Sequence, residues 1–151
     1  MTNAKQNSTS NEETIPKWFI PVAVLAMVWN LMGVMAFINQ VMMTPEMIAE
    51  LPQAEQVFYT SLPLWATIAF ACAVFGGAFG SLALLMKKML AEPLLILSLV
   101  GVAVQMFHSF VISNSFKVFG PDGAIMPAIV VVIAISLVRL VSKAKTKGWL
   151  S

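Results

Sequence analysis

The sequence predicts an all-α fold, a bundle of four helices that crosses a membrane. Four apolar segments, each about as long as a bilayer is thick, fill most of the 151-residue chain. Because a helix rises about 1.5 Å per residue, roughly 20 residues cross a hydrocarbon core of about 30 Å. Hydrophobic residues make up 59% of the chain and charged residues only 11%, against about 25% charged residues in soluble domains. This composition excludes a water-soluble protein and a nucleic-acid-binding protein.

Each predicted span begins or ends near residues that favour helix ends. The four spans are residues 18–41, 63–86, 93–116 and 125–141. A proline, whose missing N–H costs nothing in a first helical turn, lies near each start, at Pro21, Pro63, Pro93 and Pro127. The first three spans contain no Asp, Glu, Lys or Arg, and Arg139 lies near the end of the fourth. Gly120-Pro121 is expected to end the third helix, and Asp122 to cap the fourth.

Charge and polarity predict the domain limits and the orientation. Residues 1–16 form a polar tail that we expect to be disordered, residues 17–142 the transmembrane domain, and residues 143–151 a basic tail. Most basic residues outside the spans lie in the two tails and in the connection after the second span, whereas the first connection carries three Glu and no basic residue. By the positive-inside rule, both termini then face the cytoplasm.

The first outer connection is expected to form two short amphipathic helices. Thr44-Pro45-Glu46 combines an N-cap residue, a first-turn proline and a first-turn acid, and it predicts a helix that ends near Leu51. Pro52 begins a second helix that ends near Tyr59. Their apolar side chains would lie on the membrane surface while the glutamates face water. The segment is either a structural lid or a surface for gating or partner docking.

Polar side chains inside the spans form the candidate functional site, because hydrocarbon offers them no water. In the third span, small or polar residues repeat every three or four positions, which places Gln105 and His108 on one helical stripe. Asn30 lies on a similar stripe of the first span. Because both helices run in the same direction, we expect Asn30, Gln105 and His108 to cluster near the midplane, with Trp29 as a stacking wall. The cluster is either a hydrogen-bonded clasp or a site for a solute, a proton or a lipid headgroup.

Two further sets of residues belong to the prediction. A polar set at the outer ends of the first and third spans, which helix capping explains equally well, comprises Asn39, Gln40, Ser113 and Asn114. The glycines expected to allow close helix packing are Gly33, Gly76, Gly80 and Gly101. The small residues of the second span provide either an interface between subunits or contacts within the bundle.

The residue types exclude most membrane chemistry. The single histidine, His108, cannot supply the two axial ligands of a membrane cytochrome b, and the single Cys72 cannot form an internal disulfide. No carboxylate lies within a span, which counts against zinc and di-iron sites and against the small multidrug antiporters. We therefore expect no metal, no cofactor and no enzymatic activity.

Several short motifs resemble those of a known group of proteins. They are Trp29-Asn30-x-x-Gly33, Phe75-Gly76-Gly77-x-x-Gly80-Ser81, Gln105-Met106-x-His108, Ser113-Asn114 and Gly148-Trp149-Leu150. Over residues 16–150, the chain resembles uncharacterised bacterial inner-membrane proteins that often carry the label "sugar transporter", and it is more distantly similar to DoxX-like four-helix proteins. The resemblance implies a location in the bacterial inner membrane and a transport function.

Two functions remain open from the sequence. The first is a small-solute, sugar-like transporter in which Trp29, Asn30, Gln105 and His108 contact the solute. Because four helices alone enclose little space, we expect it to act as a homo-oligomer. The second is a non-catalytic accessory protein that assembles with a larger membrane protein. The polar cluster favours the first, and the lack of an intramembrane carboxylate for ion coupling favours the second.

Overall fold

A computed structural model describes residues 14–151, which form helices and no strand. The four long helices are α1 (Phe19–Val41), α4 (Leu64–Leu85), α5 (Ala91–Phe107), which a π-helical turn η1 (His108–Ile112) extends, and α7 (Asp122–Thr146). Each of these four segments is long and apolar enough to cross a membrane. The all-α fold with four candidate spans is thus confirmed. Most of the tail predicted to be disordered, residues 1–16, lies outside the described residues.

The limits of the third and fourth predicted spans differ from the structure. The third span was expected to continue to Phe116, but its helix ends with η1. Asn114 then takes a left-handed conformation with a φ of 47°, which a right-handed helix cannot accommodate, so the chain breaks there. The fourth helix begins at Asp122, which leaves Pro127 inside it, and it continues to Thr146, beyond the predicted end at 141.

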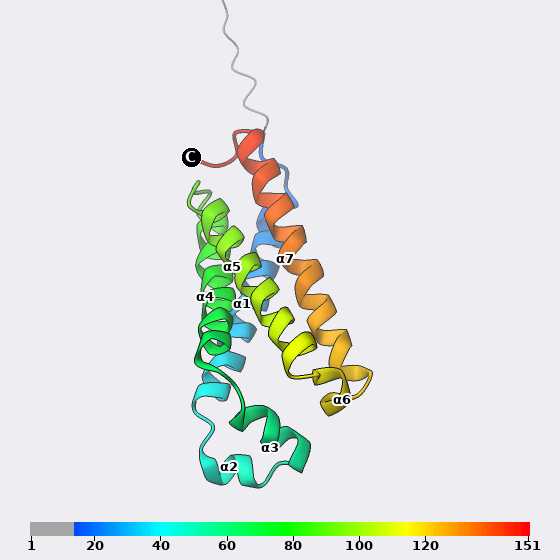
Figure 1. Cartoon of the computed structure of the whole chain (residues 1–151). Coiled ribbons are helices and arrows are strands. Elements are labelled where there is room, and N and C mark those ends of the chain that lie inside the picture. The colour runs from blue at the N-terminus through cyan, green and yellow to red at the C-terminus, as the bar shows by residue number, and fades with distance from the viewer. Residues whose placement is uncertain (1–13) are drawn as a thin grey trace, which may run out of the picture.

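Backbone contacts connect the long helices in the order α1, α4, α5, α7. α4 lies between α1 and α5, and α5 also packs against α7. The backbones of α1 and α7, at the two ends of this row, hardly approach each other. Figure 1 shows α1 and α7 diverging away from the end that holds the C-terminus.

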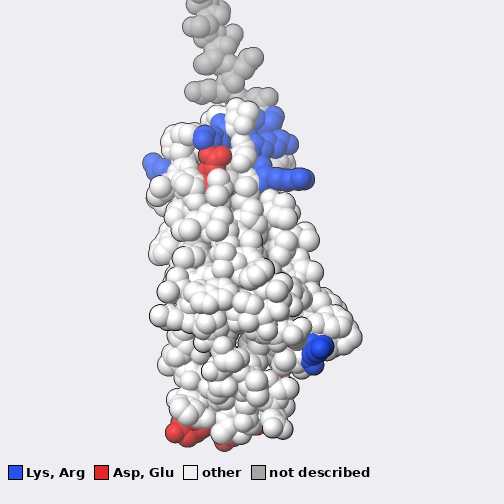
Figure 2. All heavy atoms as spheres, viewed as in Figure 1, with Lys and Arg blue, Asp and Glu red and all other residues white. Residues whose placement is uncertain are grey.

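The two ends of the bundle differ in charge. Figure 2 shows most Lys and Arg at the end with the C-terminus, which we call the basic end. Acidic side chains mark the opposite end, which we call the loop end, and the surface between the two is almost free of charge on the face shown. Such a wide uncharged belt is what a helical protein presents to lipid.

Three short helices lie at the loop end: α2 (Pro45–Ala49), α3 (Gln53–Thr60) and α6 (Ser115–Phe119). The Thr44 hydroxyl caps α2 by accepting a hydrogen bond from the backbone N–H of Met47 at 3.3 Å. Hydrogen bonds from its own backbone N–H and from Thr44 hold the pKa of Glu46 below its usual value. The Thr-Pro-Glu sequence thus starts a helix by the local interactions that the residues predict.

Side-chain contacts connect these short helices to one another. Gln56 Nε2 of α3 donates to the carbonyl oxygens of Ala49, at 3.0 Å, and Leu51, at 2.7 Å. The rings of Phe58 in α3 and Phe119 in α6 meet edge to face, with centroids 5.4 Å apart. The loop end is therefore a connected layer across the bundle rather than a set of separate loops.

The closest contact in the bundle is the one between α4 and α5. A Cβ added at Gly101 would lie 2.7 Å from the carbonyl oxygen of Ala69 and 2.7 Å from the backbone nitrogen of Ala73. The Ser98 hydroxyl donates to the carbonyl oxygen of Ala73 at 2.6 Å. Gly76 and Gly80 face α5 in the same way. These glycines pack helices within one chain, which is one of the two roles that the sequence left open.

Candidate functional site

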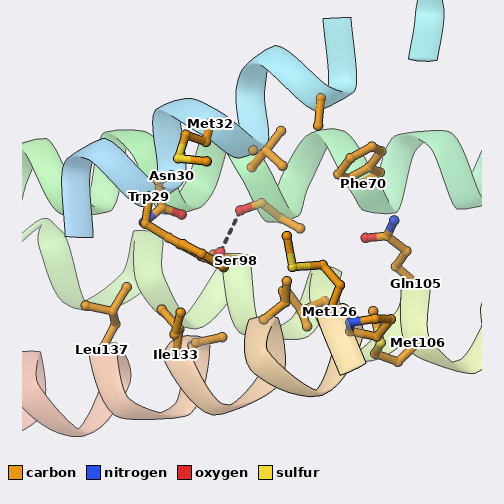
Figure 3. Close-up of a pocket in the computed structure, with 18 of the residues that line it drawn as sticks. Trp29, Asn30, Met32, Phe70, Ser98, Gln105, Met106, Met126, Ile133 and Leu137 are labelled. Carbon is orange, nitrogen blue, oxygen red and sulfur yellow. Dashed lines mark hydrogen bonds between the residues drawn. The ribbon is translucent and has the colours of Figure 1, made fainter. Parts of the chain in front are cut away.

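All four long helices line one cavity of about 410 Å³, with α4 and α5 as its floor (Figure 3). Its wall consists of Trp29, Asn30, Met32, Gly33 and Ala36 of α1, Phe70, Ala73 and Val74 of α4, Leu95, Ser98, Val102, Gln105 and Met106 of α5, and Met126, Pro127, Val130, Ile133, Ala134 and Leu137 of α7. Met32 of α1 and Met126 of α7 line the cavity and are both exposed, so we place its opening between these two helices. A single chain therefore contains more space than four packed helices were expected to enclose.

Asn30 lines this cavity but is already hydrogen-bonded within the fold. Its Nδ2 donates to the carbonyl oxygen of Ala26 at 2.8 Å and to Ser81 Oγ of α4 at 3.0 Å. Its Oδ1 lies against the backbone of Gly77, where any Cβ would collide with it. Asn30 thus joins α1 to α4, as the clasp interpretation of the sequence proposed.

Gln105 and Trp29 are the lining residues whose polar groups are all unused, whereas Asn30 uses its Nδ2 and turns Oδ1 toward Gly77. Among residues 14–151, neither the Gln105 amide nor the Trp29 indole N–H forms a hydrogen bond. Figure 3 shows Gln105 near Phe70, at the end of the cavity away from Leu137. A neutral amide that is both donor and acceptor is therefore available to a ligand in the cavity.

Asn30 and Gln105 lie at different depths, although we expected them at the same level. A Cβ at Gly77 would contact both Asn30 Oδ1 and Ser98 Oγ, so these side chains share one level. Gln105 follows Ser98 by seven residues, which is about 10 Å along α5. Asn30 is 11 residues into α1, whereas Ser98 is only 7 residues into α5. The first helix therefore starts about one turn further toward the basic end.

His108 lies outside the cavity, so the expected three-residue cluster does not form. It follows Ser98 by ten residues, which is about 15 Å along the helix axis. Its side chain is 2% exposed and meets the Trp65 ring edge to face at 5.2 Å. Ser113 Oγ lies 3.3 Å from Nδ1 and 3.2 Å from Nε2. An oxygen equidistant from both nitrogens cannot lie on the N–H axis of either, which makes this a weak hydrogen bond.

The remaining predicted residues lie around the loop end and along α1. Asn39 is exposed and Gln40 is half-buried near the end of α1, and neither lines the cavity. Asn114 supplies the left-handed residue after η1. Gly33 does line the cavity, and a Cβ there would lie 3.1 Å from Cγ1 of Val74 in α4. The outer polar set is therefore separate from the cavity.

Aromatic side chains close the bundle at the basic end. The Trp149 ring meets those of Trp18 and Phe19 edge to face, with centroids 6.0 Å and 5.6 Å apart. Phe19 is completely buried and belongs to the same apolar cluster as Leu137, which also lines the cavity. The Ser151 N–H donates to the carbonyl oxygen of Lys87 at 2.8 Å, so the C-terminal segment crosses this end.

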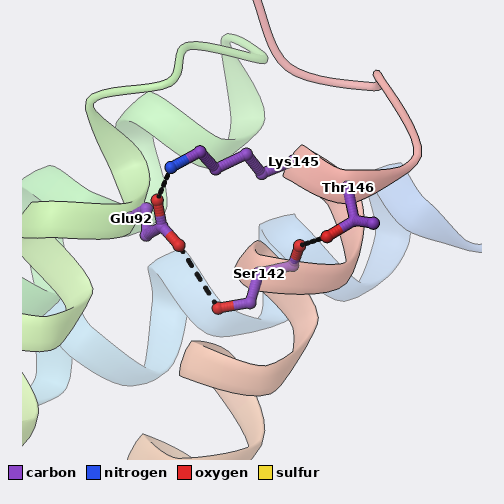
Figure 4. A network of polar contacts seen from close by, with 4 residues as sticks. All are labelled: Glu92, Ser142, Lys145 and Thr146. Atoms are coloured by element: carbon purple, nitrogen blue, oxygen red, sulfur yellow. Dashed lines mark hydrogen bonds and ion pairs between the residues drawn. The ribbon is translucent and has the colours of Figure 1, made fainter.

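A polar network joins α5 to α7 at the same end (Figure 4). Lys145 Nζ lies 2.5 Å from Glu92 Oε2, and Ser142 Oγ donates to Glu92 Oε1 at 3.4 Å. The side chains of Lys145 and Glu92 are 45% and 20% exposed. The contact therefore lies at the rim, outside the apolar interior.

The sequence analysis named Gly77 and Ser81 only within a motif and did not predict that these two α4 residues hold Asn30. They are four positions apart and therefore lie one above the other on the α4 face that meets α1. The signal in the sequence was that Gly77 and Ser81 directly follow Gly76 and Gly80. The pair Gly76 and Gly80 packs against α5, whereas Gly77 and Ser81 contact Asn30 of α1.

The remaining observations concern metals and related proteins. Within residues 14–151, no three His, Cys, Asp or Glu side chains are placed to hold a metal ion together. Comparisons with protein-family models, with curated proteins and with solved structures find no match. The fold and the cavity define a helical protein with four candidate membrane spans and a side opening between α1 and α7.

Proposed function

We propose that the protein is a multi-pass membrane protein with both termini in the cytoplasm. The basic end, which includes Lys87, Lys88 and Lys145, would then lie on the cytoplasmic side. Acidic Glu46, exposed on α2, belongs to the opposite end. This distribution and the resemblance to bacterial inner-membrane proteins support a bacterial inner-membrane location.

Cysteine labelling in cells tests this orientation. In a Cys72→Ala background, an impermeant maleimide should label Glu50→Cys at the loop end of intact cells. The matched variant Lys88→Cys at the basic end should react only after the membrane has been permeabilised. The reverse pattern would contradict the proposed orientation.

The function that the cavity supports best is the binding and carriage of a small solute. Its volume of about 410 Å³ lies within the range of about 300–1,000 Å³ that is typical of ligand pockets. The lining is mostly apolar, and Gln105 and Trp29 offer the unused polar groups. A sugar would leave several hydroxyls without partners there, each at a cost of about 1–3 kcal/mol. The cavity therefore favours an uncharged solute with few polar groups over a sugar.

One observation favours the second function, that of an accessory protein that assembles with a larger membrane protein. None of the residues that line the cavity is Asp, Glu, Lys, Arg or His. A carrier driven by an ion gradient generally uses an intramembrane ionisable group to couple the ion to its substrate. A protein that binds its ligand here and presents it to a larger membrane partner needs no such group.

Cavity filling tests small-molecule binding directly. We would measure equilibrium binding and uptake in proteoliposomes for uncharged solutes that range from glucose and glycerol to short-chain amides and alcohols. Ala134→Phe places a ring in the cavity and should abolish binding of any true ligand. Ala128→Phe makes the same change on α7 at an exposed position outside the cavity lining and should leave binding intact. Equal binding by both variants would contradict the cavity as the site.

A further inference from the structure

The opening of the cavity lies between two helices in the uncharged belt. Met32 of α1 and Met126 of α7 line the cavity and are each 57% exposed. At the basic end, the rings of Phe19 and Trp149 pack over the interior. In a bilayer, the gap between α1 and α7 would therefore face lipid. Methionine side chains at such a rim are flexible and can adapt to molecules of different shape.

We propose that the ligand is a membrane-dissolved amphiphile with an apolar body and one hydroxyl or carbonyl group. It enters sideways between α1 and α7, and its oxygen hydrogen-bonds to the Gln105 amide. This inference rests on the proposed function, in which the cavity binds a small molecule, and it names the chemical class and the route of entry.

The state of each polar group in the lining supports this class of ligand. Asn30 Nδ2 already donates to the carbonyl oxygen of Ala26 and to Ser81 Oγ, and the Ser98 hydroxyl donates to a backbone carbonyl oxygen. The Gln105 amide and the Trp29 indole N–H form no hydrogen bond among the described residues, and Asn30 Oδ1 faces Gly77. An amide without a partner in apolar surroundings is costly, and one ligand oxygen would relieve that cost. The missing charge in the lining excludes a charged headgroup, which would be left unpaired.

The same chemistry separates the amphiphile from its two competitors. A lipid acyl chain would fill the apolar space but leave the Gln105 amide unsatisfied. A sugar would satisfy Gln105 but leave most of its own hydroxyls facing apolar side chains such as Val102 and Ile133. A molecule with a single oxygen satisfies both the amide and the apolar wall.

A photoactivatable decanol with a diazirine in its chain tests the proposal in proteoliposomes. After illumination, mass spectrometry identifies the labelled residues. We expect saturable labelling at lining residues such as Met32, Met106 and Met126, and competition by decanol but not by decane. Gln105→Met keeps the apolar volume and should weaken binding about three- to tenfold. Ser136→Ala removes a hydroxyl that is bonded within α7 on an exposed face, and should have no effect.

Two further arms keep the test decisive. Gln105→Asn keeps the amide but withdraws it by one methylene, and it should bind decanol more weakly than the wild type even if Gln105→Met does not fold. Equal competition by decanol and decane, or unchanged binding in the folded Gln105 variants, would overturn the inference by showing acyl-chain filling only. A third outcome separates this inference from the proposed function. If decanol does not bind but a water-soluble solute does, and Ala134→Phe abolishes that binding, the proposed function stands and this inference fails.

Discussion

Replacing Gly101 by alanine tests the α4–α5 contact that forms the floor of the cavity. The new Cβ would lie 2.7 Å from the carbonyl oxygen of Ala69 and from the backbone nitrogen of Ala73. Ordinary contacts of a Cβ begin at 3.4 Å, and both neighbours are backbone atoms that cannot rotate away. The helices must therefore separate by about 0.7 Å, which strains packing along the whole interface.

The expected loss is about 0.6–2.6 kcal/mol in the free energy of unfolding. Overpacking a close-packed site typically costs about 1–3 kcal/mol. Separation of the helices also lengthens the bond from Ser98 to Ala73, now 2.6 Å, and a hydrogen bond between membrane helices averages about 0.6 kcal/mol. Against these losses, alanine is the better helix former by about 1 kcal/mol. The overpacking cost therefore decides the size of the net loss, because the lost hydrogen bond and the gained helix propensity nearly cancel.

Gly33→Ala is the matched control. It adds the same methyl group to a helix and gains the same helix propensity, but its nearest neighbour is Cγ1 of Val74, a side-chain atom, at 3.1 Å. We expect it to change stability by less than about 1 kcal/mol. Reversible unfolding in bicelles, followed by steric trapping, measures both variants. A Gly101→Ala cost no larger than that of Gly33→Ala would refute the close backbone contact.

Three other contacts give predictions that the same unfolding assay can check. A double-mutant cycle of Asn30→Leu and Ser81→Ala should give a coupling near 0.6 kcal/mol, and zero coupling would contradict the bond between them. Asn114→Val should cost about 1–2 kcal/mol because a β-branched residue resists a φ of 47°, whereas Asn114→Gly should be tolerated. Glu92→Gln should cost at most about 1 kcal/mol and lose that effect in high salt, since its partner Lys145 is partly exposed; a larger, salt-independent loss would indicate a buried pair.

Hydropathy predicted the number and approximate limits of the long helices because an apolar run of about 20 residues has few alternatives to a membrane span. It could not predict where the third span ends. The segment after Ile112 is still mostly apolar, and the break depends on the backbone conformation of Asn114, a residue type that tolerates left-handed geometry but does not require it.

The spacing of small and polar residues predicted which helix faces carry them, but not how deep these residues lie in one helix relative to another. The expected cluster assumed that the first and third spans begin at the same level. In the structure, Asn30 lies level with Ser98 and bonds to α4, while His108 packs against Trp65 near the loop end. Relative depth depends on how far each helix extends beyond the bundle, and α1 begins at Phe19, whose ring packs against Trp149. No periodicity within one helix carries that information.

The cavity itself follows from the sizes of side chains on facing helices. α4 carries small residues on two faces, so α5 and α1 both approach it closely, as Gly101 and Gly77 show. α1 and α7 face each other differently along their length. Near the basic end the two helices converge, and their shared core contains Phe19, Leu137 and Val141 as well as the small Ala23, Ala26 and Ala144. Further along, large side chains line the space between them, at Trp29, Met32, Met126 and Ile133. α1 and α7 diverge beyond this shared core, and α4 and α5 cover one side of the space between them. The cavity therefore lies where α1 and α7 have diverged while α4 and α5 still pack against each other.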